Sequence, residues 1–145
     1  MLARRPMDKF TRNYTIALLI IGAILLFRLF YETPGVSSLN ATLAEHAELA
    51  AYPYRFRVLG FDDGVATMST PRSAEFPAYR ALVILYPQLR DHAPDSQAMI
   101  DAQQELARVQ GIARRIVAES DDVTRVVWQL DEAWLRAAGF DPSRL

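Results

Sequence analysis

An uncharged stretch near the start of the chain constrains the fold more than any other feature. From Tyr14 to Phe27 no residue carries a charge, and beyond Arg28 the apolar character continues to Tyr31. A helix over residues 14–31 rises about 1.5 Å per residue and spans roughly 27 Å, close to the thickness of a hydrocarbon core. The stretch therefore predicts a single transmembrane helix over residues 14–31.

The residues at the two ends of this span support the prediction. Tyr14 and Tyr31 bracket it, as aromatic residues do at the two membrane interfaces. Arg28 lies within one turn of the exit end, where a long basic side chain can reach the headgroups. We expect Tyr14, Arg28 and Tyr31 to anchor the helix in the bilayer.

Flanking charge predicts the orientation of the span. After Arg28 the next basic residue is Arg55, whereas four basic residues precede the span: Arg4, Arg5, Lys9 and Arg12. The positive-inside rule then places residues 1–13 in the cytoplasm and residues 32–145 on the far side of the membrane. Because the chain is rich in arginine and alanine, we expect a bacterial inner-membrane protein with a periplasmic C-terminal domain.

Two other interpretations of the apolar stretch carry less weight. A cleaved signal peptide needs small residues just after the apolar run, and Arg28-Leu-Phe-Tyr-Glu-Thr-Pro34 is a poor site. A retained signal-anchor is therefore favoured, with cleavage as the alternative. A buried core helix is less favoured, because this run is apolar on all faces and flanked by charge.

Composition excludes several classes of chemistry. The chain has 145 residues and no cysteine, so it contains no disulfide, thiolate metal site or thiol nucleophile. Its net charge of −1 does not indicate nucleic-acid binding. The part after the span, about 110 residues, is long enough to fold on its own hydrophobic core.

Residue patterns after the span predict a small α+β domain. Thr33-Pro34-Gly35 should break the chain's first helix, and a second helix should follow to about Ala50. Alternation over 54–70 around Asp62-Asp63-Gly64 predicts a β-hairpin. A three-residue loop would pair Phe61 with Val65 and place Val58 opposite Met68.

The second half of the domain predicts further helices and one more strand. Residues 73–89 fit either a helical face or a buried strand, and their prolines favour a helix over about 75–86. A long apolar stripe predicts a helix from Asp95 or Ser96 to about Glu119. A strand over 123–130 and a short helix over 132–138 complete the expected fold, a hairpin plus one strand packed against three to four helices. The expected core comprises Phe56, Val58, Trp128 and the stripe.

No residue pattern in the chain predicts catalysis, a metal site or a cofactor. His46 and His92 lie far apart in the sequence, and a zinc site without cysteine would need them to converge with carboxylates. Asp62 and Asp63 lack the spacing of a calcium loop and fit a hairpin turn. We therefore expect no enzyme activity, with a small anchored hydrolase using these four residues as an alternative.

Basic residues in the first half of the domain suggest an interaction patch. Arg55, Arg57, Arg72 and Arg80 lie close together in a domain that is acidic as a whole. Such a patch could contact an anionic membrane surface or an acidic partner.

The anchor and the absence of a catalytic pattern together favour an interaction or assembly module. We expect an accessory subunit of an envelope or membrane complex, whose partners are the lipid bilayer and other membrane or periplasmic proteins, and not nucleic acid. A ligand-sensing domain that signals through its transmembrane helix is a further alternative. With a tail of residues 1–13, it would have to signal through a partner.

Overall fold

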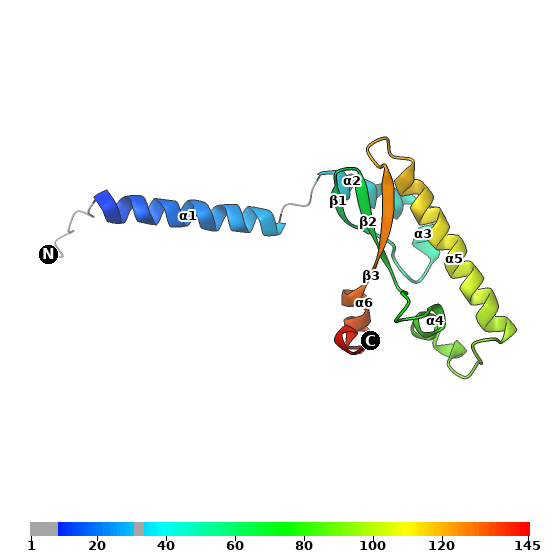
Figure 1. The fold of residues 1–145 in the computed structure, drawn as a ribbon. Coiled ribbons are helices and arrows are strands. Elements are labelled where there is room, and N and C mark those ends of the chain that lie inside the picture. Colours follow the sequence, from blue (N-terminus) through cyan, green and yellow to red (C-terminus); the bar gives the residue numbers. More distant parts are fainter. Residues whose placement is uncertain (1–8, 31–33) are drawn as a thin grey trace. The chain divides into compact units, whose positions relative to one another are not determined.

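The computed structural model describes residues 9–30 and 34–145, which belong to two compact units (Figure 1). In the first unit, Met1–Glu32, the described residues form one helix. The second unit, Thr33–Leu145, contains a three-stranded sheet and five α-helices in its described part. The prediction of a mixed α+β domain after an apolar helix is confirmed at this level.

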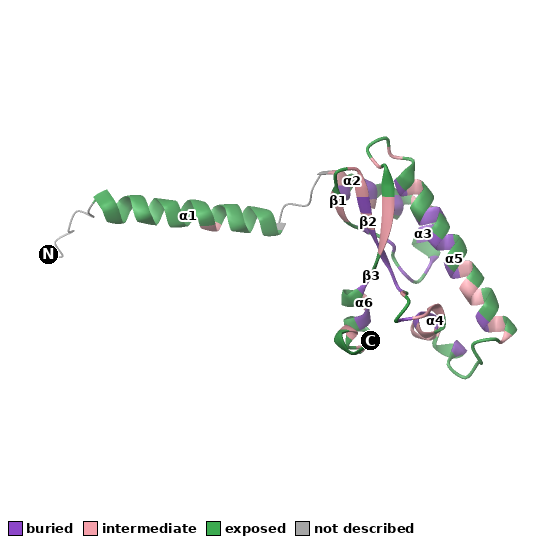
Figure 2. Ribbon diagram, viewed as in Figure 1, coloured by how far each residue is buried: buried purple, intermediate pink, exposed green. Residues whose placement is uncertain are grey.

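Helix α1, Lys9–Phe30, is apolar around its whole circumference and exposed along its length (Figure 2). Leu19, for example, is 68% exposed. Among the described residues, α1 is the one helix long and apolar enough to cross a membrane, judged by length and composition. Tyr14 and Arg28 are exposed on it, whereas Tyr31 lies outside the described residues.

The sheet combines an antiparallel hairpin with a parallel strand. Strands β1, Val58–Asp62, and β2, Val65–Thr70, are antiparallel, and β3, Arg125–Leu130, pairs with β2 in parallel. The strand order is β1-β2-β3, so β2 is central and the other two are edges. A parallel pair needs a long crossover, and here the chain between β2 and β3 forms it from helices.

The hairpin was predicted with the wrong loop. Asp62 pairs with Val65, so the loop has two residues, Asp63 and Gly64, and Phe61 lies opposite Ala66. Both loop residues have positive φ, 46° and 75°, as the tight hairpin turn of an Asp-Gly pair requires. The predicted pair of Val58 with Met68 is nevertheless present, because a β-bulge between Val58 and Gly60 shifts the register.

The prediction of three to four helices in the domain was too low. The helix expected up to Ala50 is two helices, α2, Pro34–Glu45, and α3, Ala47–Ala51, separated by an extended His46. Leu43 and Leu49 are both buried, and on one straight helix they would point about 120° apart. The break allows both to reach the core. Pro34 and Gly35 lie in the first turn of α2, where proline is tolerated.

The remaining helices lie close to their predicted positions. Residues 73–89 contain helix and no strand, and Ser96 caps the long helix by accepting a hydrogen bond from the Met99 N–H at 3.3 Å. Asp131 caps the last α-helix through the Trp134 N–H. The elements are α4, Ala78–Leu85; a 3₁₀ turn, Pro87–Leu89; α5, Gln97–Ala118; α6, Glu132–Ala137; and a second 3₁₀ turn, Pro142–Arg144.

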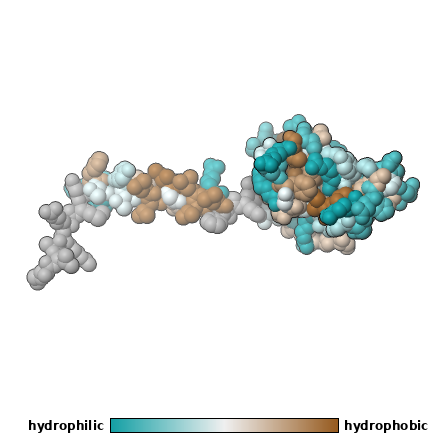
Figure 3. Space-filling view, turned by 90° about the horizontal axis from the view of Figure 1, so that it is seen from below, coloured by the Kyte–Doolittle hydropathy of each residue, from teal (hydrophilic) through white to brown (hydrophobic). Residues whose placement is uncertain are grey.

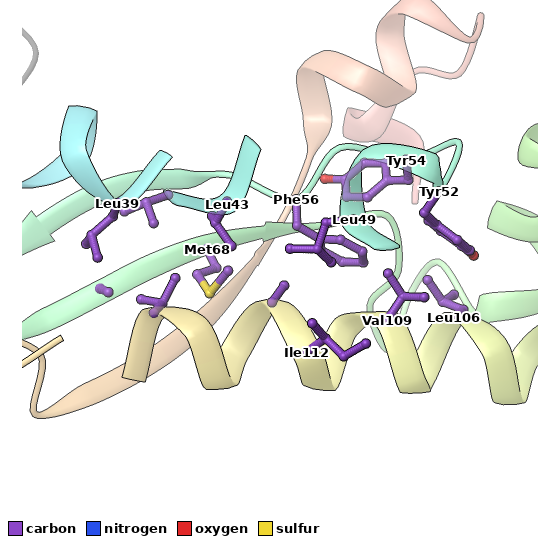
Figure 4. Packing of buried hydrophobic residues seen from close by; sticks show 14 of the residues in the cluster. Leu39, Leu43, Leu49, Tyr52, Tyr54, Phe56, Met68, Leu106, Val109 and Ile112 are labelled. Carbon is purple, nitrogen blue, oxygen red and sulfur yellow. The ribbon is translucent and has the colours of Figure 1, made fainter. Parts of the chain in front are cut away.

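The main core lies between the sheet, α2, α3 and α5 (Figure 4). Met68 of β2 and Phe56 share this core with Val109 and Leu106 of α5, as the stripe predicts. Trp128 is only half buried, because β3 is an edge strand. A second, smaller cluster of buried residues joins α4, α6 and the segment before α4; its members are Phe76, Ala81 and Leu135.

Candidate functional site

A groove of about 460 Å³ opens between α4 and the chain that follows α6. Its lining is mostly apolar, with two arginines and no acidic residue; the lining residues are Tyr79, Arg80, Val83, Ile84, Pro87, Arg90, Ala138 and Phe140. Figure 3 views the domain from the side of α4 and α6 and shows hydrophobic atoms at the centre of this face, bordered by hydrophilic ones. The groove thus combines a mostly apolar lining with two like charges.

A tight turn before α4 positions Phe76, which contacts the groove residues Arg80 and Phe140. The N–H of Ser73 donates to the carbonyl of Phe76 at 2.8 Å, and the Phe76 N–H donates back to Oγ of Ser73 at 3.0 Å. Oγ of Ser73 also donates to Oε2 of Glu75. These bonds hold the Phe76 ring in the smaller core, where it is fully buried.

The wall opposite α4 depends on the chain reversal at Gly139. This glycine has φ of +89° and ends α6, and the Phe140 N–H returns to the carbonyl of Leu135 at 3.0 Å. The Phe140 ring packs edge-on against Phe76, with centroids 5.5 Å apart. This reversal places Phe140 in the groove.

Arg80 links the two aromatic rings and brings charge to the groove. Its guanidinium carbon lies 4.7 Å from the centroid of Phe76 and 5.9 Å from that of Phe140. Cation–π contact of this kind fixes the side chain without neutralising it. Within the described residues neither Arg80 nor Arg90 has a carboxylate within 4.0 Å. The groove therefore offers two uncompensated positive charges beside apolar side chains.

The four arginines of the expected patch have different surroundings. Arg55 and Arg57 both line a depression beside α2 and α3. The Arg72 Nε–H donates to Oε1 of Gln110 on α5 at 3.1 Å, and Arg80 lines the groove. Arg80 shares its opening with Arg90, as Arg55 shares its own with Arg57.

Arg57 belongs to a buried hydrogen-bond network centred on Asp131. The carboxylate of Asp131 is 2% exposed and accepts from Tyr54 Oη at 2.9 Å, Arg57 Nη2 at 3.1 Å and the Trp134 N–H at 3.1 Å. Burial raises the pKa of the Tyr54 hydroxyl above its ordinary value, and the charge of Asp131 raises it further. The network joins the start of the hairpin to the end of β3, a structural role.

The histidines and aspartates considered for catalysis are dispersed. His46 separates α2 from α3 and lines a polar depression with Glu45 and Glu119, while His92 is exposed in the loop before α5. Asp62 and Asp63 are exposed at the hairpin tip. Among the residues that the structure describes, no three His, Asp or Glu side chains are grouped to hold a metal ion.

Arg90 and the apolar lining of the groove were not singled out from the sequence. Arg90 follows a 3₁₀ turn that periodicity does not reveal, and Phe140 reaches α4 only through tertiary folding. Tyr79 and Val83 lie on α4, and neither they nor Arg90 form a motif that the sequence alone could have marked. No family model, no curated protein and no solved structure matches the chain.

Proposed function

We propose that the protein is a single-pass membrane protein whose α+β domain is an interaction module, an accessory subunit or assembly factor of a membrane complex. In this proposal α1 spans a bacterial inner membrane, residues 1–13 are cytoplasmic and residues 32–145 are periplasmic. The exposed apolar surface of α1 supports the anchor, since a helix without packing partners in water would carry a large cost.

The groove between α4 and the chain after α6 carries the interaction part of the proposal. Its partner is a protein segment that presents apolar side chains next to an acidic one. Val83, Ile84 and Phe140 provide the apolar contact, and Arg80 and Arg90 attract the carboxylate. Arg80 is held in place by Phe76, so little side-chain entropy is lost when it binds.

Labelling of single cysteines in intact cells tests the orientation, because the chain contains no other cysteine. Ser143→Cys should react with a membrane-impermeant maleimide in intact cells. Asn13→Cys should react only after the inner membrane is permeabilised. The reverse pattern, or full-length protein in the soluble fraction after high-speed sedimentation, would overturn the anchor and its orientation.

Site-specific photocrosslinking tests the groove. A photoreactive phenylalanine analogue at Tyr79, which is 39% exposed at the groove, should give one adduct of defined mass in membranes. The same analogue at the exposed Gln104 of α5 is the matched control and should not give it. Adding Arg90→Glu should abolish the Tyr79 adduct through charge repulsion, whereas Arg90→Lys should preserve most of it. An adduct that Arg90→Glu leaves unchanged would refute the proposed acidic partner.

A further inference from the structure

The two edge strands of the sheet differ in whether their outward backbone groups are hydrogen-bonded. At the β1 edge, the Asn40 side chain of α2 acts like a short strand: its Oδ1 accepts from the Val58 N–H at 2.7 Å, and its Nδ2 donates to the Val58 carbonyl at 3.0 Å. The β3 edge has no comparable cover in the described part of the chain (Figure 1). An open strand edge is a template for another strand.

The register identifies the backbone groups that β3 leaves open. The N–H of Arg125 bonds the Gly64 carbonyl at 3.2 Å, and the N–H of Asp131 bonds the Thr70 carbonyl at 2.9 Å. In a parallel ladder alternate residues bond the neighbouring strand, so Arg125, Val127 and Gln129 face β2. The N–H and C=O groups of Val126 and Trp128 therefore point away from β2, with no hydrogen bond inside the described structure.

Apolar side chains accompany these open backbone groups. Val126 and Trp128 pack against the main core but stay half buried, whereas Ala66 and Met68, their neighbours on β2, are completely buried. The difference arises because no strand lies beyond β3 to cover them. On the opposite face, Val127 is half buried between two exposed polar residues, Arg125 and Gln129.

We propose that β3 pairs antiparallel with β3 of a second copy of the chain, about a two-fold axis at Val127. Two three-stranded sheets then join into one continuous sheet. Val126 of each copy lies opposite Trp128 of the other, and each such pair exchanges two backbone hydrogen bonds. Val127 lies opposite Val127 of the second copy.

The strand's own sequence favours a second copy in this register. Residues paired in an antiparallel ladder have their side chains on the same face of the sheet. A two-fold axis must therefore lie between one residue and the same residue of the second copy. With the axis at Val127, apolar residues meet apolar ones and Arg125 lies opposite Gln129 of the second copy, without facing like charges. An axis at Trp128 would place Val127 against Gln129, and one at Arg125 would oppose two guanidinium groups.

Disulfide trapping in the full-length, membrane-embedded protein tests this pairing. The natural chain has no cysteine, so each variant adds the only reactive thiols. Val127 lies in a non-hydrogen-bonded pair across the axis, where Cα atoms are about 4.5 Å apart, within the range that a disulfide spans. Val127→Cys should therefore form a covalent dimer under mild oxidation, visible on a non-reducing gel.

Matched variants separate the register from random collision. Gln129→Cys alone should stay mostly monomeric, and combining it with Arg125→Cys should restore the dimer. Leu59→Cys, 39% exposed on the opposite edge strand, should stay monomeric. A dimer with Trp128→Cys but not with Val127→Cys would overturn the register. Equal trapping of Leu59→Cys and Val127→Cys, or no trapping of either, would overturn the pairing.

A non-covalent measurement completes the test. Val126→Pro removes an N–H that points away from β2, a position where an edge strand tolerates proline. The detergent-solubilised protein should change from dimer to monomer mass in light scattering, with its circular dichroism spectrum retained. A natural chain that is monomeric at all concentrations would refute the proposal. This outcome is independent of the groove, whose partner is detected through Tyr79.

Discussion

The hydroxyl of Tyr54 donates a hydrogen bond of 2.9 Å to Oδ2 of Asp131, and so connects the segment before β1 to the end of β3. Figure 4 shows this hydroxyl turned away from the core cluster that its ring helps to form. The same carboxylate caps α6. One buried charge thus positions three parts of the domain.

We predict that loss of this carboxylate destabilises the domain more than loss of either partner. Asp131→Ala removes a helix cap and leaves the Tyr54 hydroxyl buried without an acceptor, at a cost of about 3 kcal/mol in the free energy of unfolding. Tyr54→Phe should cost about 1–2 kcal/mol. Arg57→Ala should cost about 0.5–1 kcal/mol, because that side chain is 45% exposed. Urea denaturation measures all three, and the reverse order would contradict the network.

Asn40 should contribute to stability out of proportion to its place on a helix surface. Asn40→Ala leaves the N–H and C=O of Val58 without their partners, and we expect a loss of about 1–3 kcal/mol. Thr42→Ala on the same helix is the control, since its exposed hydroxyl bonds only the carbonyl of Ser38. That variant should change stability by less than about 0.5 kcal/mol. Equal effects in chemical denaturation would show that the Asn40 bonds contribute nothing.

Two glycine-to-alanine substitutions should have opposite signs. At Gly64 a Cβ would lie 2.6 Å from Oγ1 of Thr124, and φ is +75°, so Gly64→Ala should destabilise by at least about 1 kcal/mol. At Gly111, inside α5, a Cβ meets nothing within 4 Å. Gly111→Ala should stabilise by about 0.5–1 kcal/mol through helix propensity. Thermal melts that move in the same direction would refute this contrast.

Alkaline pH should weaken the fold through two buried phenols. Burial raises the pKa of both Tyr52 and Tyr54 above their ordinary value of 10.0, and the neighbouring Tyr86 adds to the shift of Tyr52. The folded state favours the neutral phenol. The contribution of the two neutral phenols to stability is therefore intact below pH 10 and decreases as the pH rises above it. The urea midpoint should therefore fall as the pH rises above about 10.

A double variant tests the source of that pH dependence. Tyr52→Phe with Tyr54→Phe should flatten the drop in the urea midpoint, although its stability at neutral pH is lower. Tyrosinate absorbance should rise together with unfolding in the natural chain. A slope that the double variant leaves unchanged would assign the effect to other groups.

Local elements of this fold were predictable because their causes are local. The stripe from Met99 to Ile116 has helical spacing, Ser96 and Asp131 are good caps, and Asp63-Gly64 is a turn. Even here the hairpin loop was wrong by one residue. A bulge depends on packing of both strands, and spacing alone does not reveal it.

Long-range relationships were not predictable. No sequence pattern indicated that β3 would pair in parallel with β2, or that Arg57 would form an ion pair with Asp131. The groove combines α4 with Phe140, which lies beyond α5, β3 and α6 in the chain. Such contacts are fixed by how complete elements pack, and a periodicity of two or 3.6 residues carries no information about them.

The parallel pairing of Val65 with Arg125 has a consequence for biogenesis. The ribosome synthesises β1 and β2 long before β3, so the hairpin cannot pair with β3 until the whole crossover has been synthesised. During that interval the central strand lacks one neighbour, and a nascent chain is vulnerable to wrong strand partners. A message truncated before Arg125 would yield a product with a permanently incomplete sheet, a substrate for proteases and chaperones.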